Sequence, residues 1–190
     1  SLGKNVGIIS MGYGRTSKNT KIVTDGIKKP TSWESCGDEA FLLANKLDKV
    51  PIIVGRSKYD SGLKMATKFN TDVIIIDDGF QHRSLHRDLD IVLMNSKDTS
   101  KDHRLIPLGV LRESLSNLKR ADLIIYTKSN IHNISDYLIN TLNHIKINKI
   151  KSAIDISDKL IDSNNKEVNI DIIRSKNVFL LSGIGDNEGF

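Results

Sequence analysis

The hydrophobic residues of the chain fall into short runs separated by segments with helical spacing. A continuous run of β-branched residues at 73–76 is typical of a strand buried on both faces of a sheet. Another apolar run lies at 50–56, and residues 61–69 between the two runs carry a helical pattern. Because strand, helix and strand follow one another over short connections, we expect parallel pairing. The pattern therefore predicts an α/β fold with a mostly parallel sheet.

Further elements follow from the same periodicities. Strands are expected at 5–10, 21–23, 90–94 and 122–127, and helices at 40–47, 115–121 and 135–145. From about residue 148 the pattern changes, and the segment 159–168 is broken by Ser163-Asn164-Asn165, which predicts a β-hairpin. A new strand with a glycine turn is expected at 177–185. We therefore expect a first domain at 1–147, a β-hairpin linker at 148–175 and the start of a second α/β lobe at 176–190.

The most distinctive polar residues come directly after the run at 73–76. Asp77 and Asp78 are followed by Gly79-Phe80-Gln81-His82. Ligands of open parallel sheets bind at the carboxyl ends of the strands, and two carboxylates there are costly without a charge partner. A magnesium-nucleotide site would explain them. A strand-to-helix turn in which either acid caps a helix explains them equally well.

Two glycine-containing segments have similar alternatives. Gly12 and Gly14 follow the first strand, where glycine allows a tight turn or a close approach to a ligand. Gly37-Asp38-Glu39 precedes the helix at 40–47, so Asp38 suits an N-cap and Glu39 suits the helix dipole. Neither segment by itself decides between a structural role and a functional one.

Composition and charge narrow the class of protein. The 190 residues contain 28 Lys and Arg against 23 Asp and Glu, a net charge of +5. This surplus suits a phosphorylated substrate or an anionic membrane surface, although an ordinary solvated surface explains it too. Nucleic acid is not an expected partner, because aromatic residues make up 5% and no basic cluster alternates with them.

The cysteine content and the start of the chain bear on its cellular compartment and its organisation, and a single cysteine fits a reducing compartment. The single cysteine, Cys36, excludes an internal disulfide and has no histidine signature beside it, which argues against a thiol enzyme. No stretch approaches the roughly 18 consecutive apolar residues of a membrane span. The chain begins without a methionine or a signal-like segment, and we expect it to be an internal piece of a longer protein.

The order of the motifs is more specific than any one of them. The segment that begins at Asp77 continues through Leu85-x-Arg87-Asp88-Leu89-Asp90, and it lies between a glycine-rich turn and a Leu-Arg-Glu turn. In sequence the motifs are Ser10-Met11-Gly12-Tyr13-Gly14-Arg15, Gly37-Asp38-Glu39, residues 77–90, residues 105–113, Lys119-Arg120-Ala121-Asp122 and residues 181–185. Over essentially its whole length the chain resembles the tetraacyldisaccharide 4′-kinases of lipid A biosynthesis.

This resemblance implies a P-loop-type three-layer α/β fold and an enzyme at the cytoplasmic face of the bacterial inner membrane. The implied reaction moves the γ-phosphate of ATP to the 4′-hydroxyl of tetraacyldisaccharide 1-phosphate with the help of Mg²⁺. The expected partners are therefore ATP, the lipid A disaccharide precursor and the membrane surface. The alternative is a nucleotide-dependent switch or a degenerate binding module that lacks phosphoryl transfer.

The resemblance also implies roles for single residues. Asp38 matches the position of the general base, and Glu39 beside it would support metal or substrate placement. Asp77 and Asp78 match the acidic pair that holds Mg²⁺-ATP. The remaining implied positions are Gln81 and His82, in the cofactor-binding set, for positioning the acids or the disaccharide, Arg112 for a phosphate, Glu113 for a metal-bound water, and the turn Gly12-Tyr13-Gly14-Arg15 for the substrate.

Several departures from the family pattern bear on catalysis. The glycine-rich Gly-Lys-Thr loop and the membrane helix of the family would lie before Ser1, and a histidine partner of the base would lie beyond Phe190. We therefore expect residues 1–190 alone to be catalytically incomplete. Met11 stands where the family has arginine. The other departures are Ala40 and Val110, each in place of proline, and Asp186-Asn187 in place of Asn-Pro.

Other charged residues have simpler interpretations. The charges of Arg87-Asp88-Leu89-Asp90 are more readily explained as structural ion pairs than as direct catalytic groups. His86, His103 and His132 show no metal-ligand spacing, and we interpret them as surface or packing residues.

Overall fold

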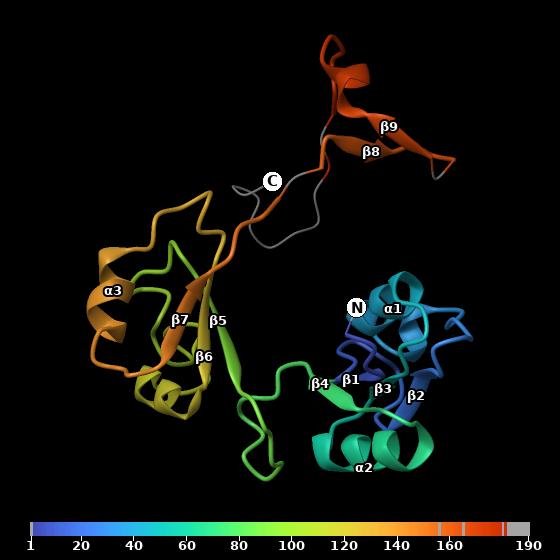
Figure 1. Ribbon diagram of the computed structural model, residues 1–190, viewed down its shortest axis with the longest axis horizontal. Coiled ribbons are helices and arrows are strands. Elements are labelled where there is room, and N and C mark those ends of the chain that lie inside the picture. The colour runs from blue at the N-terminus through green and yellow to red at the C-terminus, as the bar shows by residue number, and fades with distance from the viewer. Residues whose placement is uncertain (1, 156, 165, 180, 182–190) are drawn as a thin grey trace. The chain divides into compact units, whose positions relative to one another are not determined.

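The computed structural model describes residues 2–155, 157–164, 166–179 and 181, and it has an α/β fold (Figure 1). The chain divides into two compact units, the first ending at Asp90 and the second beginning at Ile91. Each unit has its own sheet and its own apolar clusters, so each is described by itself.

The first unit is built on a four-stranded sheet in the order β2-β3-β1-β4. Its strands are β1 (Val6–Ser10), β2 (Lys21–Thr24), β3 (Ile52–Val54) and β4 (Val73–Ile76). Strand β1 pairs in parallel with both β3 and β4, while β2 runs antiparallel at one edge. The predicted strands and their parallel pairing are therefore confirmed in this unit.

Helices cover both faces of this sheet, which gives three layers (Figure 1). Helix α1 (Asp38–Lys46) packs on one face, where Ala40 and Ala44 lie against Ile8 and Ile52. Helix α2 (Lys58–Lys68) packs on the other face through Met65. The short helix η1 (Trp33–Ser35) precedes α1. Because successive strand residues point to opposite faces, the neighbours of Ile8 and Ile52 along β1 and β3 contact α2.

Strand β4 differs from its prediction. The β-branched run was expected to be buried on both faces, yet Val73 and Ile75 are 44% and 52% exposed. Ile74, which alternates with them, packs against the α2 cluster. The reason is the position of β4: it pairs only with β1 among the described strands, and α1 lies over β2 and β3. An apolar composition alone does not distinguish a central strand from an edge strand.

The second unit contains a parallel three-stranded sheet in the order β5-β6-β7. Its strands are β5 (Ile91–Asn95), β6 (Leu123–Thr127) and β7 (Asn148–Lys151). The short helix η2 (Leu115–Arg120) and helix α3 (Asp136–Leu142) form one apolar cluster with the sheet. The cluster consists of Met94, Leu118, Ile124, Tyr126, Leu138 and Leu142.

The chain after β7 forms the predicted hairpin. Strand β8 (Lys159–Ile161) pairs antiparallel with β9 (Glu167–Asn169), and the short helix η3 (Ile170–Ile173) follows. Residues 148–151, which the sequence assigned to a linker, instead form β7 of the second sheet. The strand and glycine turn expected at 177–185 lie largely outside the described residues, and the three-part division at 147 and 175 stays a prediction.

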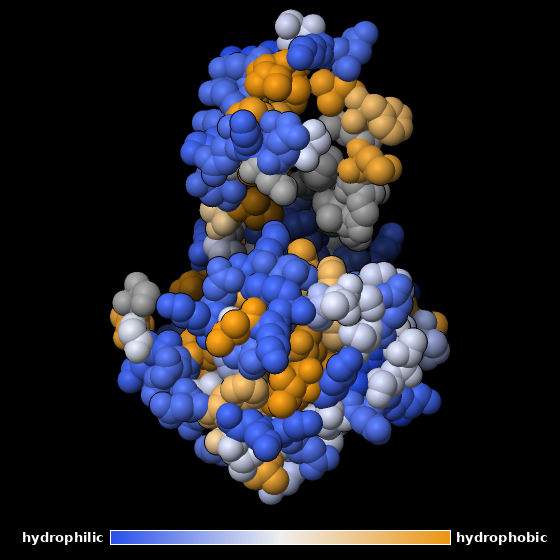
Figure 2. Space-filling model, turned by 90° about the vertical axis from the view of Figure 1, so that its right-hand side faces the viewer, coloured by the Kyte–Doolittle hydropathy of each residue, from blue (hydrophilic) through white to orange (hydrophobic). Residues whose placement is uncertain are grey.

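Apolar side chains gather in patches on an otherwise hydrophilic surface (Figure 2). Exposed apolar residues of the described part include Val73, Ile75, Leu93, Leu108 and Val110. No helix in this part of the chain has the length and apolar character needed to cross a bilayer.

Candidate active site

The candidate site lies at the carboxyl ends of the parallel strands of the first unit. Asp77 comes directly after β4, and its backbone N–H donates to the Ile9 carbonyl at 2.9 Å. The buried Ser10 hydroxyl at the end of β1 donates to Asp77 Oδ2 at 3.1 Å. These two bonds orient the first acid of the pair, at the edge of the sheet where ligands of such folds bind.

Asp78 continues this turn in an uncommon conformation. Its φ is 51°, in the left-handed region that non-glycine residues seldom occupy. Such strain is concentrated at functional sites and turns. No helix begins between Asp77 and Asp90, all of which the structure describes, so the helix-cap interpretation of the acidic pair is wrong. Both carboxylate side chains belong to exposed residues at the strand end.

The Gly-Asp-Glu segment forms the start of α1. Gly37, with a φ of 94°, is the N-cap residue, so the prediction that Asp38 is the N-cap is wrong by one position. Asp38 is the first residue of the helix and accepts the Glu39 N–H on Oδ1 at 2.9 Å. Both acids therefore occupy the first helical turn, where the helix dipole favours negative charge.

Two glycines bring this segment against the turn after β1. A Cβ on Gly37 would lie 2.7 Å from the Tyr13 carbonyl oxygen and 2.8 Å from the Gly12 carbonyl carbon. A Cβ on Gly12 would lie 2.5 Å from the Cys36 carbonyl oxygen. The two loops therefore meet backbone to backbone, which only glycine allows. This contact holds the predicted substrate turn beside Asp38.

The contact gives a stability prediction. Gly37→Ala is expected to lower the free energy of unfolding by about 2 kcal/mol or more, because it adds a backbone clash to the cost of a positive φ. Gly14→Ala is the matched control: Gly14 has a φ of 76°, but a Cβ added there would meet no atom within 4 Å. Urea denaturation of the two variants measures the difference. Equal destabilisation would contradict the packing argument.

The acids of the two segments act on one another. Loss of hydration raises the pKa of the Glu39 carboxyl, and the charges of Asp77, Asp38 and Asp78 raise it further. Lys58 opposes this shift. The fold therefore brings the two acid pairs, which are far apart in the sequence, close enough for their charges to act on one another.

Lys58 is the site residue that sequence reasoning missed. The helix was expected to begin near Ser61, but α2 begins at Lys58. The Lys58 side chain is buried and its ammonium group donates to the Asp77 carbonyl at 2.7 Å. Burial lowers the pKa of this ammonium group, while Asp77, Asp78 and Glu39 act in the opposite direction. A lysine just after the Gly55-Arg56-Ser57 turn was the available signal.

The segment after the acidic pair is braced by an ion pair. Arg87 contacts Asp90 at 2.6 and 2.9 Å, and its Nη1 also donates to the His82 carbonyl at 2.6 Å. This geometry agrees with the structural interpretation of these charges. Burial lowers the pKa of the His82 imidazole, as do Lys58 and Arg87, whereas Asp78 raises it. Gln81 lies in the same exposed turn.

Arg15 is engaged within its own loop. Its guanidinium group donates to the carbonyls of Met11 at 3.3 Å, Asn19 at 2.5 Å and Lys18 at 3.1 Å. Partial burial lowers the pKa of Arg15, and the Arg56 charge adds to the effect. Tyr13 is exposed. The substrate role predicted for this turn stays a prediction, and the structure gives Arg15 a clear structural role in shaping it.

Arg112 and Glu113 belong to the second unit. Glu113 accepts from Arg120 Nη2 at 2.9 and 3.1 Å and from Asn117 Nδ2 at 2.9 Å. Its carboxylate thus binds two side chains of η2, while Arg112 is exposed. The roles predicted for this pair in binding phosphate and metal stay predictions.

Comparison with known proteins places this geometry in a family. The family model of the tetraacyldisaccharide-1-P 4′-kinases (LpxK) matches residues 1–190. The chain belongs to the tetraacyldisaccharide 4′-kinase family. A tetraacyldisaccharide 4′-kinase of Aquifex aeolicus is 38% identical over 98% of the chain, and one of Chlorobium limicola is 32% identical over 100%.

A solved structure agrees with this membership. The crystal structure of LpxK from Aquifex aeolicus in complex with ATP superposes with a TM-score of 0.75 at 36% identity, covering 92% of this chain and 52% of that one. The chain spans 56% and 55% of the Aquifex and Chlorobium kinases, about half the length of these relatives. The predicted family and the predicted α/β fold are therefore confirmed.

The kinase family implies Mg²⁺, and the donor set at this edge of the sheet fits it. Within the described residues, no group of three or more His, Cys, Asp or Glu side chains is placed to hold a metal. Mg²⁺ does not need one, because it is usually bound by one or two carboxylates together with substrate phosphates and water. Asp77 and Asp78 supply such carboxylates. A hard oxygen donor set suits this ion.

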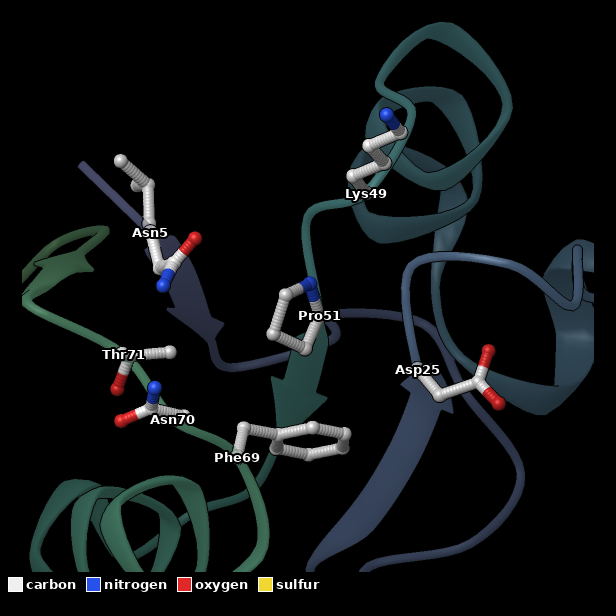
Figure 3. A pocket seen from close by; sticks show the side chains of 8 residues that line it. Asn5, Asp25, Lys49, Pro51, Phe69, Asn70 and Thr71 are labelled. Atoms are coloured by element: carbon white, nitrogen blue, oxygen red, sulfur yellow. The ribbon is translucent and has the colours of Figure 1, made fainter. Parts of the chain in front are cut away.

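The hollow in Figure 3 is not part of this site. It has a volume of about 200 Å³ and lies among Asn5, Pro51 and Thr71, which precede β1, β3 and β4 respectively. It is therefore at the amino ends of the parallel strands, the opposite edge of the sheet from the acids. Ligands of this fold class bind at the carboxyl ends.

Proposed function

We propose that the full-length protein transfers the γ-phosphate of ATP to the 4′-hydroxyl of tetraacyldisaccharide 1-phosphate. The observation that carries the proposal is the cluster of Asp38, Glu39, Asp77 and Asp78 at the carboxyl ends of the strands. Membership of the kinase family supports the assignment of these two substrates. Phosphoryl transfer needs positioning, stabilisation of negative charge on the phosphoryl oxygens and a group that accepts the hydroxyl proton. A carboxylate can accept the proton, and a carboxylate pair can hold the Mg²⁺ that would stabilise the charge.

Asp38 is the proposed general base. One of its oxygens accepts a helix N–H, which leaves lone pairs on the exposed carboxylate for a further proton. In the proposed step the 4′-hydroxyl proton passes to Asp38 while the hydroxyl oxygen bonds to the γ-phosphorus. The bond from that phosphorus to the β,γ-bridging oxygen breaks, and ADP leaves. Glu39 beside it would support the placement of the metal or the substrate.

The remaining predicted site residues also have proposed roles. Asp77 and Asp78 would hold Mg²⁺, which when bound neutralises charge on the β- and γ-phosphates. His82 and Gln81, in the turn that follows, would position these acids or the disaccharide. The Gly12–Arg15 turn beside Asp38 would contact the acceptor, and Arg112 and Glu113 would contribute to phosphate and metal-water binding. The roles of the first-unit residues rest on the family pattern together with the placement of the acids, and those of Arg112 and Glu113, which belong to the second unit, rest on the family pattern alone.

The cellular setting belongs to the same proposal. An acceptor with four acyl chains lies in a membrane, so the protein would work at the cytoplasmic face of the bacterial inner membrane. The net charge of +5 suits an anionic lipid surface. Because the chain spans about half the length of its relatives, residues 1–190 alone are expected not to transfer phosphate.

The proposal is tested with the full-length protein. We expect label from γ-labelled ATP to appear in tetraacyldisaccharide 1-phosphate in the presence of Mg²⁺, with one ADP formed per lipid phosphorylated. An acceptor lacking the 4′-hydroxyl should remain unlabelled. Binding of Mg²⁺-ATP without any labelled lipid would instead support a nucleotide-dependent switch and would contradict the proposed kinase.

A further inference from the structure

Lys58 occupies an unusual place for a lysine. Its relative exposure is 2%, and it is the one charged residue among the buried polar residues of the described part of the chain. It is also the first residue of α2. Burial of an ammonium group is costly unless it is paired, and the amino end of a helix disfavours positive charge. The position is therefore unfavourable for lysine on two separate grounds.

Helix formation by itself does not require this lysine. The Ser57 side chain already caps α2 by accepting the Asp60 N–H at 3.1 Å. Met65 and Ser61 supply the buried face of the helix. A medium-sized apolar side chain at position 58 would fill the same space without a desolvation cost. The interactions that offset the cost of burying this lysine must therefore be made by its ammonium group.

The ammonium group faces the acid cluster. It donates to the Asp77 carbonyl at 2.7 Å, and the carboxylates of Asp77, Asp78 and Glu39 favour its charged form. The bonded carbonyl belongs to the peptide that joins Asp77 to Asp78. Asp78 has a φ of 51°, and strained backbone of this kind persists where surrounding contacts hold it. The Lys58 bond is one such contact, because it holds the Asp77 carbonyl oxygen directly before Asp78.

We propose that Lys58 is a positioning residue for the acidic pair. Its ammonium group holds the Asp77 carbonyl, so that the turn presents both carboxylates in one geometry to a divalent cation carried by a nucleoside triphosphate. This inference rests on the proposed function, because it concerns the same acids. Lys58 touches neither the acceptor nor the phosphates in this role: it acts through the Asp77–Asp78 peptide from the buried side of the cluster.

The test compares three variants of the full-length protein. Lys58→Met removes the charge and the donor, Lys58→Arg keeps both, and Lys64→Met is the matched control. Lys64 lies on the same helix and also donates to a backbone carbonyl, that of Thr20 at 3.2 Å, away from the acids. For each protein we would measure the unfolding midpoint, Mn²⁺ affinity with a non-hydrolysable ATP analogue, and kcat and KM.

Lys58→Met is expected to weaken Mn²⁺ binding and to lower kcat by roughly 10- to 100-fold each, the usual cost of losing a partner that orients a metal ligand. The KM for the lipid acceptor should not change. Lys58→Arg should recover most of the loss, and Lys64→Met should match the wild type in both measurements. A purely structural role of Lys58 would lower the unfolding midpoint of Lys58→Met without changing its Mn²⁺ affinity.

Wild-type Mn²⁺ affinity in a folded Lys58→Met protein would overturn the proposal, and so would equal losses in the arginine and methionine variants. If Lys58→Met does not fold, Lys58→Gln replaces it, with the same loss expected relative to Lys58→Arg. A wild-type protein that binds Mn²⁺ and nucleotide but phosphorylates no lipid would refute the proposed function. The Mn²⁺ measurements would still decide the role of Lys58.

Discussion

Asp38→Asn is expected to lower the kcat of the full-length protein by roughly 10²- to 10⁴-fold, the range typical of a lost general base. The amide keeps the shape of the side chain and can still accept the Glu39 N–H, as the carboxylate does at 2.9 Å. It cannot take up the hydroxyl proton. Nucleotide affinity should remain near the wild-type value, because the acidic pair after β4 is unchanged. Steady-state kinetics and equilibrium ATP binding measure the two quantities separately.

The matched control is Asp60→Asn. Asp60 is likewise an exposed acid in the first turn of a helix, α2, so it has the same favourable interaction with the helix dipole. Its substitution should leave kcat unchanged. If Asp38→Asn retains near-wild-type turnover, the assignment of the base is wrong and the proton must pass to another group.

Asp77→Asn and Asp78→Asn are expected to act on metal-nucleotide use instead. Loss of an outer partner of a metal ligand already costs roughly 10- to 100-fold, and loss of a carboxylate ligand should cost at least as much in apparent Mg²⁺ affinity. The Asp77 substitution also weakens the acceptor of the Ser10 hydroxyl, which lies 3.1 Å from Oδ2. Titration of activity with Mg²⁺ at fixed ATP, together with direct Mn²⁺ binding, measures the effect.

Asp72→Asn serves as the control for this pair. Asp72 lies at the other end of the same strand, where Oδ2 accepts the Asn5 N–H at 2.8 Å. Its loss should change stability slightly and leave the Mg²⁺ dependence of the full-length protein as in the wild type. An unchanged Mg²⁺ requirement in both Asp77→Asn and Asp78→Asn would show that neither carboxylate holds the metal.

The two assignments are linked by one electrostatic environment. Loss of hydration raises the pKa of Glu39, and the charges of Asp77, Asp38 and Asp78 add to this effect, so the acids of α1 and of the β4 end act on one carboxyl group. Neighbouring carboxylates of this kind attract a divalent cation. Lys58 limits the repulsion from the buried side. The proposed site therefore combines acids that would hold the metal with a buried ammonium group that donates to their backbone.

Local patterns were sufficient for most of the fold. The β-branched runs and the helical spacing led to the strands and helices near their observed bounds, because both depend on the period of apolar residues. The broken polar segment near Asn164 led to the hairpin, because turn chemistry is local too. The burial of β4 was not predictable in this way. Whether β4 is an edge strand or a central strand depends on which strands pair with it, and that pairing depends on distant residues.

The residues of the candidate site were also predictable only in part. The motif order was enough to single out Asp38, Asp77 and Asp78, since each lies in a short segment with a recognisable pattern. Their meeting, and the placement of Lys58 behind them, required the sheet: β1 pairs with β4, and α2 crosses between β3 and β4 to bring its first residue to the strand ends. A sequence pattern reports neighbours along the chain, not neighbours across a fold.

The acidic pair after β4 illustrates both contributions. Its residues alone were enough to show that two carboxylates end an apolar strand and that this strand belongs to an α/β kinase family. Three features came from the folded structure: the acids cap no helix, Asp78 adopts a left-handed backbone conformation, and a buried lysine donates to the peptide between them. Composition limits what a segment can form, whereas packing and charge from distant segments select its final geometry.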